Sequence, residues 1–138
     1  MRVYLAGASA EVDVCEWYRD RLLASGVEIV HNWMASVRAN PERRDNEVPR
    51  RDRKRIAATC ANHVASADVF WLLVPREPTI GAWVELGIAF GSARPAIVAS
   101  GPWATIFMDL TDRFTEHEHA FEHIVGLANR ASLREGSE

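Results

Sequence analysis

A carboxylate stands one turn into a helix that follows the most apolar segment of the chain. The segment from Asp68 to Val74 is apolar after its first residue and contains β-branched and aromatic side chains, which is typical of a strand buried on both faces of a parallel sheet. Pro75 and Pro78 end this strand, and Glu85 follows in the next helix. Ligands of open α/β sheets bind beyond the carboxyl ends of the strands, so Glu85 is the first candidate for chemistry.

The residue type of Glu85 suits one kind of reaction. A carboxylate held in place can stabilise developing positive charge or form a covalent adduct with an electrophilic carbon. Glu85 interrupts the otherwise apolar surface of its helix, which includes Leu86 and Ile88. A solvated helix carboxylate with no chemical role is the alternative interpretation, and the pattern alone leaves both open.

Length, charge and cysteine content restrict the class of protein. The chain has 138 residues and a net charge of −3, so we expect one domain over residues 1–131, a frayed tail over 132–138, and no nucleic-acid partner. Cys15 and Cys60 offer neither zinc spacing nor a disulfide framework, which fits a reducing cytoplasm. A first strand at Arg2 leaves no room for a signal peptide, and no apolar run approaches the ~20 residues that span a bilayer. We therefore expect a cytoplasmic protein without a membrane partner.

Strand-like and helix-like segments alternate along the chain. This alternation predicts an α/β fold, with a doubly wound five-stranded parallel sheet in the order 2-1-3-4-5 and helices on both faces. The expected strands are Arg2–Ala6, Val27–Val30, Asp68–Val74, Pro95–Ala99 and a brief edge strand at Asp112–Thr115, and the expected helices are Val12–Ala24, Arg50–Ser66, one opening at Ile80–Gly81 and one around Phe121–Ala128.

One connection is longer than its neighbours. The polar segment from His31 to Pro49 exceeds the usual length between a strand and a helix, and long loops are often functional, so it is a candidate lid. Its Trp33 and Met34, together with Trp83, are candidates to border a pocket, where an indole could stack on a flat ring. Packing in the core or in a dimer is the alternative for each.

Three short motifs occur in order across most of the chain. They are Tyr-Leu-Ala-Gly from Tyr4 to Gly7, Ala-Asp at the start of the central strand, and Gly-x-x-x-Glu-Leu-Gly-x-Ala from Gly81 to Ala89. Together they resemble the nucleoside 2-deoxyribosyltransferase superfamily, which includes nucleoside 5′-monophosphate N-glycosidases. The resemblance implies a flavodoxin-like sheet and an enzyme that cleaves or transfers the N-glycosidic bond of a (deoxy)nucleoside or its 5′-monophosphate, with no metal or organic cofactor.

The same resemblance assigns the two catalytic positions. Glu85 would match the glutamate that attacks the anomeric carbon, expels the base and holds a glycosyl-enzyme intermediate. Tyr4 would match the tyrosine that aims this carboxylate, although a core tyrosine with its hydroxyl bonded elsewhere is the alternative. Cleavage of an N-glycosidic bond passes through an oxocarbenium-like state, which a carboxylate stabilises. The acceptor is another base in the transferases and water in the hydrolases.

Candidate substrate-binding residues come from the motifs, from positions matched to the family pattern and from the candidate lid. They are Gly7, Ala8, Ser9, Trp33, Cys60, Thr79 and Gly81. Thr79, also a plausible helix N-cap, takes the position at which monophosphate glycosidases have a serine that contacts phosphate. The turn at Gly7 lacks the arginine that those enzymes use, so a phosphate would need another cation. The basic run of Arg43, Arg44, Arg50, Arg51, Arg53, Lys54 and Arg55 could supply it, or could be a solvated helix start.

Cys60 departs from the family pattern. Many members carry, eight positions before the aspartate of the central strand, an acidic residue that helps to protonate the departing base, and a neutral thiol is a poor substitute. A non-catalytic nucleotide-binding module on the same fold is therefore the alternative function. His119 and His123 lie one helical turn apart, but no third ligand is evident, so we expect no metal site. Family members are commonly dimers or larger, and five tryptophans leave apolar surface to bury, so we expect a homo-oligomer.

Overall fold

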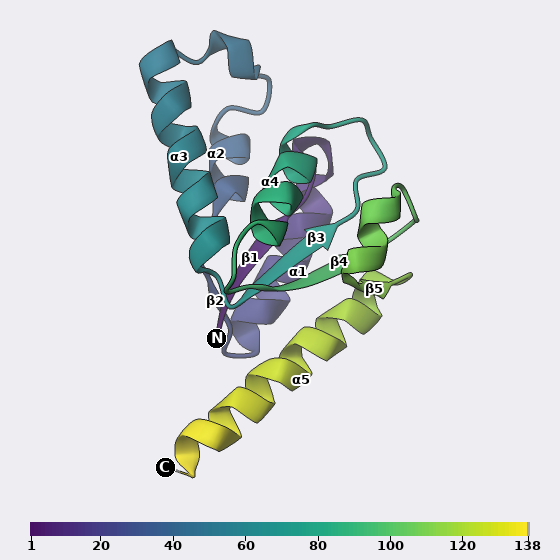
Figure 1. The fold of residues 1–138 in the computed structure, drawn as a ribbon. Helices are drawn as coiled ribbons and strands as arrows, with labels where there is room; N and C mark the ends of the chain where they lie inside the picture. The colour runs from purple at the N-terminus through teal and green to yellow at the C-terminus, as the bar shows by residue number, and fades with distance from the viewer. Residues whose placement is uncertain (138) are drawn as a thin grey trace.

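Five parallel strands form one sheet in the order β2-β1-β3-β4-β5 (Figure 1). The structure is a computed structural model, and it describes residues 1–137. The order and the parallel direction confirm the predicted doubly wound sheet, with the strand after Asp68 at its centre. The strands are β1 (Arg2–Ala6), β2 (Glu28–Ile29), β3 (Val69–Leu73), β4 (Ala96–Ser100) and β5 (Asp112–Phe114).

Helices cover both faces of this sheet, as predicted. One face carries α1 and α5, and the other carries α3 and α4. The α-helices are α1 (Val12–Ala24), α2 (Trp33–Ala39), α3 (Arg50–Ser66), α4 (Gly81–Phe90) and α5 (His117–Gly136), and the 3-10 helices are η1 (Ser9–Glu11), η2 (Asp45–Glu47) and η3 (Ile106–Leu110).

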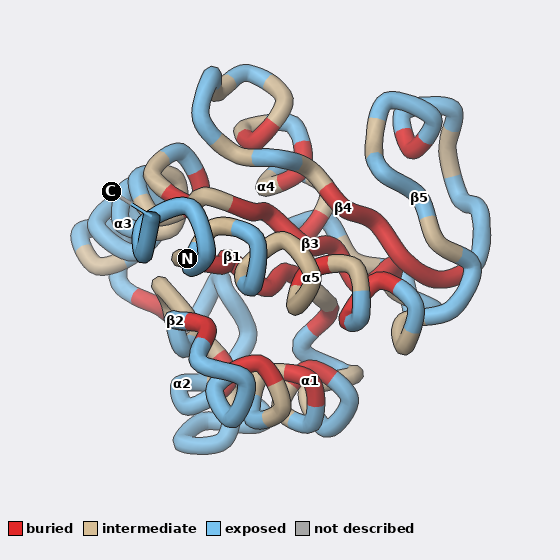
Figure 2. Tube along the Cα trace, turned by 90° about the horizontal axis from the view of Figure 1, so that it is seen from below, coloured by how far each residue is buried: buried red, intermediate tan, exposed pale blue. Residues whose placement is uncertain are grey.

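Alternate residues of β1 enter two separate cores, because successive side chains of a strand point to opposite faces. Val3 and Leu5 pack with α1 and α5, whereas Tyr4 and Ala6 pack with α3 and α4. Figure 2 shows the buried residues concentrated along β1, β3 and β4. The sheet therefore separates the surroundings of Tyr4 from those of its neighbours in sequence.

The segment from His31 to Pro49 is not one loop. It contains α2, in which Met34 is fully buried. The indole N–H of Trp33 donates a hydrogen bond of 2.7 Å to the carbonyl oxygen of Leu5. Because β2 ends at Ile29, this carbonyl has no strand partner on that side, and Trp33 takes the place of the next strand residue.

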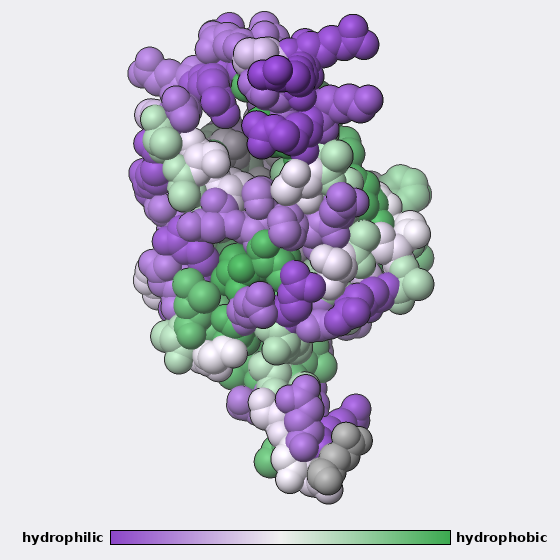
Figure 3. Space-filling model, turned by 90° about the vertical axis from the view of Figure 1, so that its left-hand side faces the viewer, coloured by the Kyte–Doolittle hydropathy of each residue, from purple (hydrophilic) through white to green (hydrophobic). Residues whose placement is uncertain are grey.

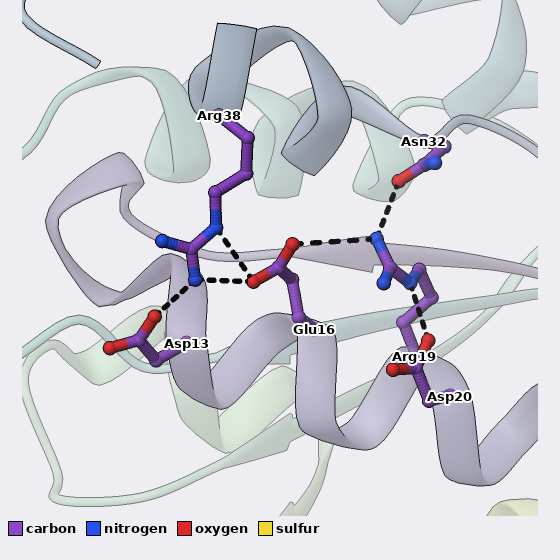
Figure 4. A network of polar contacts seen from close by, with 6 residues as sticks. All are labelled: Asp13, Glu16, Arg19, Asp20, Asn32 and Arg38. Atoms are coloured by element: carbon purple, nitrogen blue, oxygen red, sulfur yellow. Dashed lines mark hydrogen bonds and ion pairs between the residues drawn. The ribbon is translucent and has the colours of Figure 1, made fainter.

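Side-chain contacts also fasten α2 to α1. Arg38 contacts both Asp13 and Glu16, while Arg19 reaches Asn32 at 3.0 Å (Figure 4). Exposed pairs of this kind contribute little singly, but here several meet around one carboxylate. The first half of the candidate lid is therefore attached to the body of the protein.

The C-terminal segment differs from its prediction. We expected a frayed tail from Ser132, but α5 continues to Gly136, and Glu138 lies outside the described residues. The periodic pattern of buried residues stops at Ile124, whereas the helix goes on with exposed residues such as Leu133. No helix within residues 1–137 combines the length and the apolar character needed to cross a membrane.

Candidate active site

A hollow of about 460 Å³ lies between α3 and α4. This volume falls within the range of small-molecule sites in proteins. On α3, Arg53, Ala57 and Cys60 are spaced by four and three residues, so they share one face of the helix. The lining residues are Arg43, Asp45 and Val48 from the preceding segment, Arg53, Ile56, Ala57, Cys60 and Ala61 from α3, and Gly81, Val84, Glu85 and Ile88 from α4.

Glu85 places a poorly solvated carboxylate in this hollow. The residue is half-buried, and its Oε2 atom is buried without a hydrogen-bond partner among the described residues. Burial raises the pKa of Glu85, and the nearby Tyr4 hydroxyl partly offsets this by lowering it. A buried polar atom without a partner costs free energy and is uncommon in folded proteins. Among the described residues, Nε2 of His123 is the other such side-chain atom, and it lies outside the hollow. The position thus fits a reacting group better than a solvated helix carboxylate.

Tyr4 approaches Glu85 from β1, the neighbour of the central strand. It is 1% exposed, and burial raises its pKa, with further contributions from Glu85 and Cys60. The phenol therefore stays protonated and is available as a hydrogen-bond donor. The fold brings together Tyr4, Cys60 and Glu85, which come from three distant segments of the chain.

Cys60 contributes a neutral thiol to the hollow. Burial and the Glu85 carboxylate both raise the pKa of this thiol. Its sulfur lies 3.6 Å from Nε2 of His31. A thiol with a raised pKa is a poor proton donor. The Tyr4 hydroxyl and the His31 imidazole are the titratable groups in contact with it, and of these two the imidazole titrates closer to neutral pH.

His31 is a site residue that sequence reasoning did not single out. Its ring stacks on Tyr4 at 6.1 Å between centroids and on His63 at 5.2 Å, while Tyr4 stacks in turn on Phe70 at 5.8 Å. Burial, and then the neighbouring His63, lower the pKa of His31, so its imidazole is neutral near pH 7. The available signal was its place directly after the second strand, where the carboxyl ends of the strands meet the site.

Two predicted substrate-binding residues near the start of α4, Thr79 and Gly81, line different cavities. Gly81 lines the hollow beside Glu85. Thr79 instead lines a larger groove of about 1040 Å³, together with Trp83, on the η3 side of α4. Ile80 occupies the N-cap position and no side chain caps the helix, so the prediction that Thr79 is the N-cap is wrong.

The turn after β1 also lies apart from the hollow. Ala8 lines a small cavity of about 160 Å³ between the turn, α1 and the end of β3, and Ser9 is exposed at the start of η1. A Cβ atom on Gly7 would come within 2.6 Å of the sulfur of Cys15, so packing against α1 requires the glycine. Trp33 also lies apart from the hollow, because its indole N–H donates a hydrogen bond to the Leu5 carbonyl and the residue is not among those that line the hollow.

The histidines of α5 do not form a metal centre with their neighbours. No group of three or more His, Cys, Asp or Glu side chains within the described part of the chain is placed to hold a metal ion. His123 lies 3.8 Å from Asp112, and His119 is exposed.

Comparison of the sequence with protein-family models and with curated proteins gives no match. Among solved structures, the chain is similar to the CMP N-glycosidase BcmB of Clostridium botulinum. The TM-score is 0.54 at 14% sequence identity, and the alignment covers 90% of this chain and 97% of that one. At this identity the similarity concerns the fold, and the chain therefore shares the α/β architecture of that protein.

Proposed function

We propose that this protein cleaves or transfers the N-glycosidic bond of a (deoxy)nucleoside or a nucleoside 5′-monophosphate, with Glu85 as the nucleophile. The observation that carries the proposal is the half-buried Glu85, which lines a hollow of ligand size beside the protonated Tyr4 and whose Oε2 atom is buried without a partner. The fold shared with a CMP N-glycosidase supports the same reaction class by analogy.

The covalent sequence has two steps. In the first, a carboxylate oxygen of Glu85 bonds to the anomeric carbon, the bond from that carbon to the base nitrogen breaks, and its electron pair leaves with the base. In the second, water or another base attacks the anomeric carbon and the ester bond breaks, which restores the Glu85 carboxylate. Tyr4 orients this carboxylate through its hydroxyl.

Proton transfer needs a group other than Cys60, whose thiol is neutral and has a raised pKa. We assign this task to His31, which contacts the sulfur. A neutral imidazole can accept the proton of the attacking water in the second step. Cys60→Asp tests the first step: a carboxylic acid at this position should raise activity on poor leaving groups if proton donation to the departing base limits the rate, provided that the protein still folds.

Release of free base from a panel of nucleosides and 5′-monophosphates tests the function directly. In an active preparation, Glu85→Gln should lower turnover by about a thousandfold or more, which corresponds to ~4 kcal/mol of transition-state stabilisation. Glu122→Gln, on the exposed side of α5, is the matched control and should leave turnover unchanged. A Glu85→Gln variant that keeps the wild-type rate would show that the nucleophile is assigned wrongly.

A non-catalytic nucleotide-binding module is the second candidate, and the neutral thiol of Cys60 favours it. Such a module would bind a nucleotide in the hollow but release no base from any member of the panel. Saturable binding without base release, unchanged by Cys60→Asp, would select this alternative.

We also propose that the protein forms a homo-oligomer through α4 and η3. Ile80, Ile106 and Leu110 are 80%, 67% and 70% exposed. Ile80 lines one groove together with Trp83 of α4 and Phe107 of η3. Large apolar side chains gathered on one surface mark interaction sites. Light scattering should give a mass of at least twice 15.5 kDa, and Ile106→Glu should shift it toward the monomer.

A further inference from the structure

We infer that the substrate bound in the Glu85 hollow is an anion, and that Arg43 and Arg53 bind its charged group. This inference rests on the proposed function in taking the hollow as the substrate site and the ligand as a nucleoside. It names the chemical class of ligand, a nucleoside that carries a phosphate or a carboxylate, and it assigns the cations that recognise it.

Four arginines of the basic run fall into two pairs with different surroundings. Arg51 and Arg55 lie 3.9 and 3.7 Å from Asp52, which leaves their charge partly compensated. Arg43 and Arg53 line the hollow, and neither side chain forms an ion pair or a hydrogen bond with another described residue. The charges of these two lining residues are therefore uncompensated by other described residues and are available to a ligand in the hollow.

The distance between Arg53 and Cys60 along α3 indicates how long a ligand must be to reach both residues. Arg53 and Cys60 are seven residues apart on the same face of the helix, which places them roughly 10 Å apart along the axis. Between them the wall is apolar, with Ile56 and Ala57 on α3 and Val48 opposite. A ligand that fills the hollow has its uncharged body against this wall and its charged end at the arginines. Figure 3 shows hydrophilic residues gathered over the end of the molecule where α3 begins.

Charge balance inside the hollow requires these arginines if the ligand is an anion. Asp45 and Glu85 also line it, and each would repel a phosphate or a carboxylate. Among the residues that line the hollow, Arg43 and Arg53 are the cations. Thr79, the residue expected to contact phosphate, lies in a different groove, so it does not provide this interaction.

The charged group could be a phosphate on the sugar or a carboxylate on the base, and both sources have the same partners. Guanidinium groups bind either oxyanion through charge-assisted hydrogen bonds. Uridine, uridine 5′-monophosphate and orotidine differ in this group while keeping one pyrimidine ring, and adenosine with its 5′-monophosphate forms a second pair. Preference for the monophosphates places the charge on the sugar, whereas preference for orotidine places it on the base.

Binding to the Glu85→Gln protein, measured by titration calorimetry, separates recognition from turnover. We expect the preferred anionic ligand to bind at least 10-fold more tightly than its neutral counterpart. Arg43→Gln and Arg53→Gln should each weaken that binding by about 10-fold and leave the neutral ligand unaffected. Arg51→Gln, on the same helix but directed at Asp52, is the matched control and should change neither.

The outcomes distinguish this inference from the proposed function. Equal binding of neutral and anionic ligands, binding that does not respond to either arginine variant, or no binding of any anionic ligand would overturn the inference. Base release from a neutral nucleoside by the wild-type protein would then still support the function. Arginine-dependent binding of an anion without any base release would uphold the inference and reject the reaction.

Discussion

The two faces of the sheet treat buried polar groups differently. On the α1 and α5 face, the indole N–H of Trp71 donates to Oγ of Ser100 at 2.8 Å, and that oxygen lies 2.6 Å from Nδ1 of His117. On the α3 and α4 face, Oε2 of Glu85 is buried with no partner. At the centre of the sheet, one face therefore bonds its polar groups to each other, and the other leaves one oxygen of the Glu85 carboxylate without a partner. Away from the centre, Nε2 of His123 on α5 is also buried without a hydrogen bond.

The two faces differ in what they contribute to the protein. We call the face covered by α1 and α5 the closed face and the face covered by α3 and α4 the open face. Trp71 and Ser100 are fully buried, so their hydrogen bond stabilises the closed face and offers no access to a ligand. The open face keeps a hollow beside Glu85, and its apolar lining residue Val84 is 55% exposed. We expect substitutions on the closed face to change the free energy of unfolding, and those on the open face to change activity.

The largest effect should come from Leu22→Ala on the closed face. Leu22 is 0% exposed, so its truncation leaves a cavity and should lower the free energy of unfolding by about 2–5 kcal/mol. Val84→Ala on the open face should cost less than about 1 kcal/mol, because the side chain is already largely solvated. Urea denaturation measures both. Equal costs for the two variants would remove the distinction between the faces.

Tyr4→Phe, compared with a tyrosine variant on the closed face, tests whether activity depends on the open face. It removes the hydroxyl that acts on Glu85 but keeps the ring, so turnover should fall roughly 10- to 100-fold. Tyr18→Phe is its counterpart on the closed face, where the hydroxyl lies 3.4 Å from Glu118. That variant should keep the wild-type rate of base release. A larger loss of activity for Tyr18→Phe than for Tyr4→Phe would contradict the assignment of the site.

Hydrogen exchange should distinguish two parts of the segment from His31 to Pro49. The part in α2 packs against the closed face, and the part after it borders the hollow on the open face. The amides of α2 should exchange slowly, because Met34 is buried and Trp33 is bonded to β1. Residues 40–47 are exposed, so they should exchange fast and become slower when a ligand occupies the hollow. Fast exchange in α2, or no response of residues 40–47 to a bound ligand, would reject this division.

The smallest effect should be the pH dependence of stability contributed by Glu85. Burial raises its pKa in the folded protein, so the folded state holds this proton more tightly than the unfolded chain. The contribution of Glu85 to stability therefore falls as pH rises from the ordinary glutamate pKa through the raised one. Glu85→Gln should be at least as stable as the wild type near pH 7, with the difference vanishing in acid. A variant less stable at pH 7 would mean that Glu85 has an unseen partner.

Local patterns determined the fold class and part of the site. The apolar run after Asp68 and the alternation of elements predicted the central strand, the strand order and the two layers of helices, because burial on both faces leaves a direct trace in residue type. The same reasoning, aided by the family resemblance, selected Tyr4 and Glu85, which the fold brings together. It missed α2, whose seven residues are held by tertiary contacts and carry little periodic signal.

Tertiary structure alone decided which polar residues share a cavity. Thr79 and Gly81 are two residues apart in the sequence yet line different cavities, because α4 separates them. His31 reaches Cys60 across 29 positions, and Arg43 and Arg53 face the hollow while Arg51 does not. The direction of a side chain depends on the helix face and on the neighbouring elements, and residue type alone predicts neither of them. The sequence thus determined the sheet and its central carboxylate, and packing around that sheet determined which partners the carboxylate has.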